Sequence, residues 1–164
     1  MFLRNVIIFE TEVEGVSRMG LARFARKAQK MAGVSGEVEI LIAGNRRLQE
    51  LNRRFRKKNK PTDVLSFPKS GSAGGDIAIS AAIACQNARR FGHSASQEVK
   101  ILVLHGMLHL GGYDHETDNG RMARIEGKLR RQLKLPVALI DRAHAPTASE
   151  RGVSRIQKPR RGSR

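Results

Sequence analysis

One segment of the sequence is apolar almost all the way round a helix, and this constrains the fold more than any other feature. Residues 96–110 carry aliphatic side chains at nearly every position from Val99 to Leu110. A helix without a polar face is buried at the centre of a domain. Two glycines, Gly111 and Gly112, end the segment. The other elements are therefore expected to pack around this helix.

The flanking segments predict strands and helices that cover the central helix. Hydrophobic periodicity and cap residues indicate strands over 3–13, 37–43, 63–67 and 76–80, and helices over 17–31, from Asn45 onward, and over 81–91, 96–110 and 118–133. This order predicts an α+β fold, in which a small mixed sheet of about four strands is packed by about five helices. We expect a metal site on the central helix, for the reasons given below.

The length and the charge of the chain limit its organisation and its partners. The 164 residues suffice for one domain, which we place at residues 1–142. Residues 143–164 are poor in large apolar side chains and are expected to be a basic, disordered tail. The net charge of +16 favours a polyanionic partner, with RNA or DNA ahead of an anionic membrane. The alternative is that the excess of basic residues serves only to keep the protein soluble.

The single cysteine excludes an intramolecular disulfide and a four-cysteine zinc site. Cys85 is interpreted as a buried helix residue rather than a nucleophile. The N-terminal segment has a short apolar run and early acidic residues, which is not typical of a signal peptide. No stretch approaches the length of a membrane span. The sequence therefore predicts a cytoplasmic protein without a membrane partner.

Three of the five histidines fall within residues 105–115, HGMLHLGGYDH. His105 and His109 are four residues apart, so on a helix their rings face the same point. The two glycines allow the chain to turn back and bring His115 to that point. Three imidazoles leave the fourth tetrahedral position of a zinc ion open, which is typical of a catalytic site. The alternative is a pair of ordinary core histidines, each of which would need a buried hydrogen-bond partner.

The spacing H-x-x-x-H-x-x-G-x-x-H is that of a class of zinc proteases, with one difference. Those enzymes use a Glu directly after the first His as general base, and Gly106 occupies that position here. This weighs against peptide hydrolysis, although Asp114 or Glu116 offers a substitute carboxylate. The other two histidines, His93 and His144, are interpreted as surface residues.

A second group of residues lies between the basic run 53–60 and the strand at 76–80. Arg56 is a candidate phosphate ligand, because a guanidinium can form a two-pronged contact with phosphate. Thr62 and Asp63 are interpreted as turn residues that satisfy backbone donors. Asp76 is either an acceptor for a metal-bound imidazole or a solvated carboxylate at the end of a strand.

Three segments together resemble the YbeY family of bacterial metal-dependent endoribonucleases. They are LNRRFRKKNKPTDVLSFP at 51–68, GGDIAIS at 74–80 and HGMLHLGGYDH at 105–115. The resemblance implies one zinc ion held by His105, His109 and His115, and a catalytic or RNA-binding role for Arg56. It also implies an α+β fold, in agreement with the order of elements above. The basic tail lies outside the matched pattern.

The resemblance also implies the reaction and the partners. The expected activity is cleavage of single-stranded RNA in 16S rRNA 3′-end maturation and ribosome quality control. The expected partners are rRNA in the small ribosomal subunit, with ribosomal proteins and assembly GTPases as further partners. Two alternatives stay open: a zinc hydrolase of another substrate such as peptide, and a non-enzymatic RNA-binding assembly factor whose metal is structural.

Overall fold

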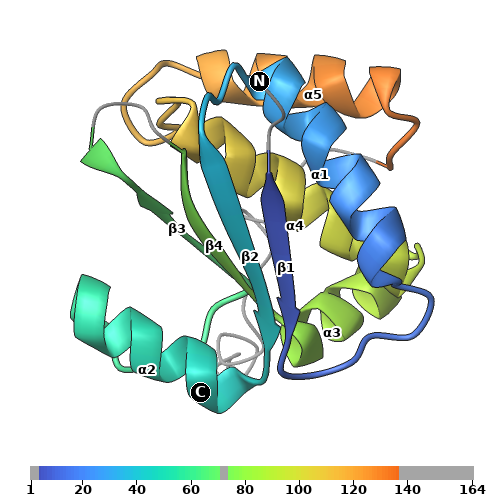
Figure 1. The fold of residues 1–164 in the computed structure, drawn as a ribbon, viewed down its shortest axis with the longest axis vertical. Coiled ribbons are helices and arrows are strands. Elements are labelled where there is room, and N and C mark those ends of the chain that lie inside the picture. Colours follow the sequence, from blue (N-terminus) through green and yellow to red (C-terminus); the bar gives the residue numbers. More distant parts are fainter. Residues whose placement is uncertain (1–3, 71–73, 137–164) are drawn as a thin grey trace, which may run out of the picture.

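The computed structural model describes residues 4–70 and 74–136 of the chain. These residues form four strands and five helices in the order that the sequence predicts (Figure 1). The elements are β1 Asn5–Phe9, α1 Arg18–Ala32, β2 Glu37–Ala43, α2 Asn45–Arg56, β3 Val64–Pro68, β4 Gly74–Ser80, α3 Ala81–Phe91, α4 Ala95–Leu110 and α5 Arg121–Gln132. The predicted α+β class is confirmed.

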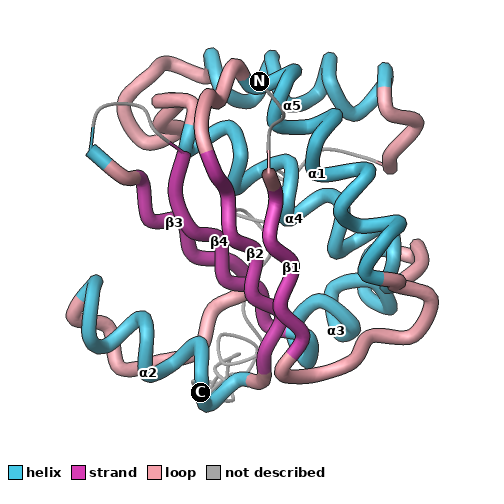
Figure 2. The backbone as a smooth tube through the Cα atoms, in the orientation of Figure 1, coloured by secondary structure: helices cyan, strands magenta, loops and turns pink. Residues whose placement is uncertain are grey.

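The four strands form one mixed sheet in the order β1-β2-β4-β3. The strands β1 and β4 run parallel to β2, and β3 runs antiparallel to β4. Figures 1 and 2 show α1, α3, α4 and α5 on one side of the sheet and α2 on the other. Both α2 and α4 contact the edge strand β3. This strand therefore connects the basic helix α2 to the histidine-bearing helix α4.

The helix α4 is the buried centre of the fold, as its composition predicts. Its aliphatic residues from Val99 to Leu108 are almost completely shielded from solvent. A Cβ atom added at Gly106 would lie 2.9 Å from the side chain of Ile77 on β4, so this glycine allows the helix to approach the sheet closely. Among the described residues, no helix is both long and apolar enough to cross a bilayer.

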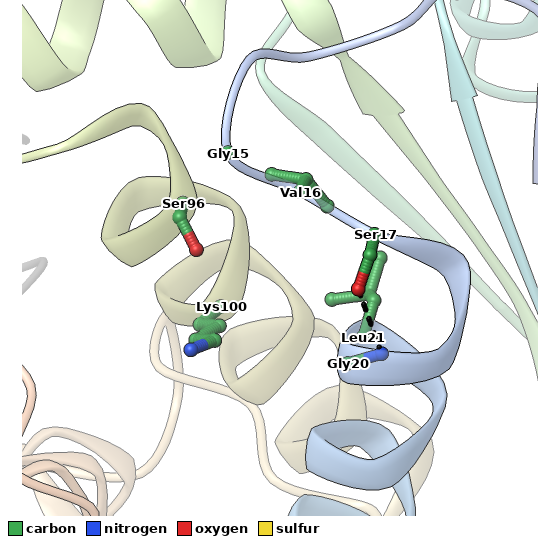
Figure 3. Close-up of a pocket in the computed structure, with 7 residues that line it drawn as sticks. All are labelled: Gly15, Val16, Ser17, Gly20, Leu21, Ser96 and Lys100. Carbon is green, nitrogen blue, oxygen red and sulfur yellow. Dashed lines mark hydrogen bonds between the residues drawn. The ribbon is translucent and has the colours of Figure 1, made fainter.

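Serine side chains cap the starts of α1, α3 and α4. Ser17 accepts a hydrogen bond from the Gly20 amide at 3.0 Å, beside the α4 residues Ser96 and Lys100 (Figure 3). Gly44 occupies the cap position of α2, and the Asn45 side chain accepts from the Ser80 hydroxyl at 2.6 Å instead. The last helix begins at Arg121 rather than at residue 118. The predicted boundary at residue 142 and the tail 143–164 lie outside the described residues.

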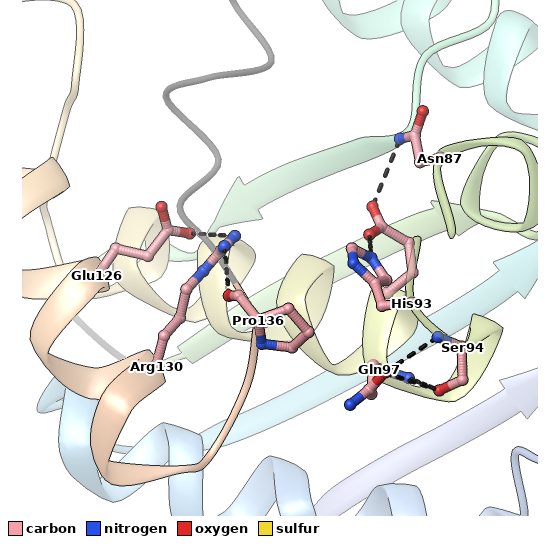
Figure 4. A network of polar contacts seen from close by, with 8 residues as sticks. Asn87, His93, Ser94, Gln97, Glu126, Arg130 and Pro136 are labelled. Atoms are coloured by element: carbon pink, nitrogen blue, oxygen red, sulfur yellow. Dashed lines mark hydrogen bonds and ion pairs between the residues drawn. The ribbon is translucent and has the colours of Figure 1, made fainter. Parts of the chain in front are cut away.

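The interpretation of His93 as a surface residue is wrong. Its side chain is 6% exposed, and its Nε2 atom lies 2.5 Å from a carboxylate oxygen of Glu98, which is fully buried on α4 (Figure 4). Asn87 of α3 also donates to this carboxylate at 3.4 Å. The buried carboxylate needs these partners, so His93 joins α3 to α4 as part of the core. Cys85 on α3 is only half-buried.

Candidate metal centre

The end of α4 and the loop after it bring His105, His109 and His115 together, as their spacing predicts. Each imidazole offers one ring nitrogen, and the three nitrogens lie within 4.8 Å of one another. His105 and His109 are half-buried at the last turns of the helix, and His115 is exposed. Among the described residues, this is the one group of histidine, cysteine and acidic side chains arranged in this way.

The loop that carries His115 depends on its two glycines. Gly112 adopts the left-handed region with a φ of 93°, which a residue with a side chain rarely adopts. A Cβ atom at Gly111 would lie 2.5 Å from the carbonyl oxygen of Ala32 at the end of α1. The Asp114 carboxylate then accepts hydrogen bonds from the Glu116 amide and the Thr117 hydroxyl. These contacts turn the chain back towards α4.

The hydrogen bonds of two imidazoles orient their remaining nitrogens towards a common point. His109 donates through Nδ1 to the backbone carbonyl of Tyr113 at 3.0 Å, and His105 Nδ1 lies 3.1 Å from a carboxylate oxygen of Glu126. A carbonyl and a carboxylate accept hydrogen bonds, so in the neutral form of each ring Nδ1 carries the proton and Nε2 carries a lone pair. Those two Nε2 atoms are 3.1 Å apart.

This arrangement fits a metal ion. Two lone pairs that face each other at hydrogen-bond distance repel, and a cation between them removes the repulsion. A metal-ligating histidine commonly donates its other ring nitrogen to a carboxylate or a backbone carbonyl, which is the arrangement of His105 and His109. The donor set of three imidazoles suits zinc and other divalent transition metals.

The electrostatic surroundings keep His109 in the form that binds a metal. Burial, together with the neighbouring His105 and His115 imidazoles, lowers the pKa of His109 from 6.5 to about 4. The hydrogen bond to Tyr113 and the charge of Asp114 oppose the shift only partly. A neutral imidazole is the form that ligates a metal. His109 is therefore ready to bind a cation at neutral pH.

Glu126 is a residue of the site that the sequence reasoning missed. It lies on α5 with its side chain 3% exposed, and Arg130 of the same helix is 3.9 Å from its carboxylate (Figure 4). The sequence did hold a sign of this role, because Glu126 lies between Met122 and Leu129 on the apolar side of α5. A carboxylate on a buried helix face needs a partner, and His105 is that partner.

Asp76 does not serve the imidazoles. Its carboxylate is about half-exposed and lies 3.6 Å from the ammonium group of Lys69. The acceptors for His105 and His109 are Glu126 and the Tyr113 carbonyl instead. Asp63 satisfies a backbone donor, as expected of a turn residue, because its carboxylate accepts from the Val64 amide at 2.8 Å.

The imidazoles line a cleft of about 740 Å³ that basic side chains also line. The end of α2, the loop after it and β3 contribute to the lining, with the basic residues Arg56, Lys58 and Lys60 among them. We call these parts the basic wall of the cleft. Arg56 donates through a guanidinium nitrogen to the Ser66 carbonyl of β3 at 2.9 Å. The volume lies in the range of ligand-binding clefts. The structure thus places Arg56 and the three histidines around one cavity.

The basic loop is held in place by Asn52. This side chain is 2% exposed and donates to the Lys60 carbonyl at 2.9 Å. The backbone carbonyl of Asn52 accepts from the amides of Lys57 and Lys58 at the end of the helix. Lys57 adopts the left-handed region with a φ of 57° and ends α2. The loop therefore presents its lysines from a fixed backbone.

Comparison with known proteins identifies the family. The family model described as "Endoribonuclease YbeY" matches residues 7–134. The chain belongs to the YbeY family. The matched region includes the helix α4, the histidine loop, Arg56 and Glu126, so every part of the candidate metal centre lies within the family domain. The resemblance seen in the sequence is confirmed.

Curated YbeY relatives match over most of their length. A protein of Koribacter versatilis (strain Ellin345), named "Endoribonuclease YbeY", is 50% identical over 143 residues, covering 86% of this chain and 93% of the relative. A protein of Solibacter usitatus (strain Ellin6076) with the same name is 47% identical, covering 85% and 95%. The solution structure of TM1509 from Thermotoga maritima matches with a TM-score of 0.54 and 26% identity, covering 80% of this chain and 92% of that one.

Proposed function

We propose that this chain is a metal-dependent endoribonuclease that cleaves single-stranded RNA. Its cellular role in this proposal is 16S rRNA 3′-end maturation and ribosome quality control in the cytoplasm. One observation carries the proposal: three imidazole nitrogens converge in a cleft that Arg56, Lys58 and Lys60 also line. The names of the curated relatives agree with this activity.

In this proposal His105, His109 and His115 hold one zinc ion per chain. Such an ion, when bound, supplies Lewis acidity towards a phosphodiester oxygen. Glu126 and the Tyr113 carbonyl fix the orientation of two of the three rings. Because these contacts exist within the protein alone, the two imidazoles need little rearrangement to bind the ion.

Arg56 is proposed to hold the scissile phosphate. A guanidinium has five N–H donors, and one of them is directed to the Ser66 carbonyl. That contact anchors the group to β3, and other donors are available for phosphate oxygens. A fixed guanidinium also offsets the negative charge that develops in phosphoryl transfer. Arg56 is therefore the proposed catalytic residue.

Lys57, Lys58 and Lys60 are proposed to attract the RNA backbone. All three are exposed, and the loop is fixed by Asn52 as described above. The chain has one Tyr, six Phe and no Trp, so few side chains are available for base stacking. We therefore expect weak sequence preference and a steep loss of RNA affinity with added salt.

The rRNA substrate within the small ribosomal subunit belongs to the same proposal. Ribosomal proteins and assembly GTPases are proposed as further partners, because a nuclease that matures rRNA acts within the assembling particle. The net charge of +16 is compatible with a polyanionic target of this kind.

Peptide hydrolysis is disfavoured by the structure around Gly106. The proteases with this histidine spacing use a Glu at that position, but here the position faces Ile77 of β4 with no room for a side chain. Asp114 binds the backbone of its own loop instead of replacing that Glu. A casein digest that disappears in His109→Ala would restore the peptidase alternative.

The test compares wild type with Arg56→Ala and His109→Ala, purified in parallel, on single-stranded RNA, duplex RNA and single-stranded DNA. We expect cleavage of single-stranded RNA by wild type only, about one metal ion per chain in wild type and Arg56→Ala, and loss of the metal in His109→Ala. Bound metal without cleavage of any RNA, at undiminished RNA affinity, would favour the assembly factor with a structural metal. Unfolding of His115→Ala would add to that result.

A further inference from the structure

The exposed face of α5 carries a row of four basic residues that the proposed cleavage chemistry does not use. We call Arg121, Arg124, Lys128 and Arg131 the α5 stripe; all four are exposed. At about 100° per residue these positions fall within an arc of about 80°, and they extend over about 15 Å of the helix. The opposite face of α5 packs on the core through Met122 and Leu129. The stripe therefore forms one continuous positive ridge.

The ridge begins at the metal centre. The guanidinium of Arg121 lies 5.4 Å from the centre of the Tyr113 ring. Tyr113 lines the cleft, and its carbonyl accepts the hydrogen bond from His109. The α5 residues that line the cleft, among them Ala123 and Glu126, lie on the opposite face of the helix, so the stripe meets the cleft at its Arg121 end. The ridge thus starts beside Tyr113, at the rim of the cleft that the end of α2 also lines.

The charges of the stripe are not balanced within the protein. Across residues 4–70 and 74–136, none of the ion pairs involves a stripe residue. Arg121 and Arg124 stand near the positive end of the α5 dipole, where cations are unfavourable. The Asp118 carboxylate, which accepts from the Gly120 and Met122 amides at the helix start, offsets this only in part. The spacings of the stripe also place like charges on adjacent turns, which destabilises a helix. An anionic partner would relieve the repulsion between these like charges.

We infer that the α5 stripe binds the phosphate backbone of the RNA strand that crosses the metal centre. This inference rests on the proposed nuclease function. The strand would contact the lysine loop after α2 on one side of the histidines and the α5 stripe on the other. Two basic surfaces on either side of the site hold the scissile phosphate more firmly than one, because the strand is fixed both before and after it. The stripe adds affinity without reading sequence, since phosphate contacts carry no base information.

The expected magnitude follows from counterion release. For single strands the logarithm of affinity falls with the logarithm of salt by about 0.7 per phosphate contact. Four contacts would therefore contribute up to about 3 to the slope, and their loss should weaken binding at least about tenfold at about 0.1 M salt. The same change should leave the thermal stability unchanged or raise it, because the like-charge repulsion within α5 is removed.

The matched control is a basic face on another helix. Arg23, Arg26, Lys27 and Lys30 are exposed on one side of α1, within an arc of about 100°, and none of them lines the cleft. Replacing each set of four by Gln removes the same net charge. Any effect of overall charge on RNA binding is therefore equal in the two variants. Gln is a good helix former, so both helices are expected to persist.

The experiment measures binding of a labelled single-stranded RNA by fluorescence anisotropy over a range of salt. It uses the full chain, and a gel checks that the RNA stays intact. If the RNA is cut, all variants are compared in the His109→Ala background. The expected result is a lower salt slope and at least tenfold weaker binding for the α5 variant at about 0.1 M salt, with little change for the α1 variant. A variant with Arg121→Lys, Arg124→Lys and Arg131→Lys should retain most of the binding, because the charge is kept.

Two results would overturn the inference. Equal weakening in the α5 and α1 variants would show that only overall charge matters, and unchanged binding in the α5 variant would show a solvated helix face. If wild type binds and cleaves single-stranded RNA and the α5 variant binds it equally well, the nuclease function stands but the α5 stripe has no part in it. Wild type that neither binds nor cleaves RNA would remove both.

Discussion

Replacing Glu126 by Gln should weaken metal binding at a site that Glu126 does not itself ligate. The carboxylate lies 3.1 Å from His105 Nδ1 and is 3% exposed, so its charge acts on the imidazole in a poorly screened environment. Loss of such a contact typically weakens metal binding 10- to 100-fold, or about 1.4–2.7 kcal/mol. Gln keeps the shape and an acceptor oxygen but removes the charge. We expect about a tenfold loss for Glu126→Gln and nearer a hundredfold for Glu126→Ala.

The assay is competition for zinc between the protein and a chelating dye at neutral pH. The matched control is Glu116→Gln, which removes an equal charge from an exposed residue that also lines the cleft. Since Arg130 loses a nearby carboxylate in Glu126→Gln, circular dichroism must first show that the metal-free variant is folded. If it is not, Glu126→Asp keeps the charge and tests the position. Equal zinc affinities of Glu126→Gln and Glu116→Gln would refute the orienting role.

Three further predictions concern single residues. Arg56→Lys should keep the metal but lower the rate of RNA cleavage by about a hundredfold, because an ammonium cannot replace a guanidinium fork; metal analysis and single-turnover kinetics check this, and an unchanged rate would contradict it. Gly106→Ala should destabilise the fold by about 1–3 kcal/mol, because its Cβ would lie 2.9 Å from Ile77; denaturant unfolding measures the change, and wild-type stability would be the opposing result. In the metal-free protein the pKa of His109 is about 4, against 6.5 for a free imidazole. Between these values the unfolded chain binds more protons than the folded chain, so the free energy of unfolding should fall as the pH drops through that window. An NMR titration that gives the His109 ring a pKa near 6.5 would contradict this prediction.

The central helix and the histidine cluster could be predicted because their causes are local. A helix without a polar face must be central, and the four-residue spacing of His105 and His109 fixes the relative position of their rings. Gly111 and Gly112 mark the end of the helix in the sequence as well as in the structure. The order of the elements followed from periodicity in the same way. The exact ends of β1 and α5 could not be predicted in this way, because strand pairing and side-chain caps determine where they begin and end.

The contacts that complete the site depend on tertiary packing and were not predictable at the same level. Glu126 meets His105 only because α5 folds back across the end of α4, 21 residues later in the chain. Arg56 is anchored to Ser66 because α2 and β3 lie side by side. In both cases the residue type was visible in the sequence, but its partner was not.

The misinterpretation of His93 has a similar cause. Glu98 stands at the start of a helix that is otherwise apolar, and a buried carboxylate requires a partner. His93 lies five residues before it, where the chain turns from α3 into α4, and its imidazole reaches that carboxylate. The charged residue on the apolar helix was the signal that a neighbouring polar side chain is buried too.

The most direct test of the central claim is the metal content of the purified chain, measured together with its cleavage of single-stranded RNA. Wild type is compared with His105→Ala, His109→Ala and His115→Ala, each checked for folding. The account predicts about one ion per chain in wild type, loss of metal and cleavage in all three variants, and recovery of activity when metal-stripped wild type is reloaded. Full metal occupancy in any folded histidine variant, or undiminished cleavage by the metal-stripped chain, would contradict it.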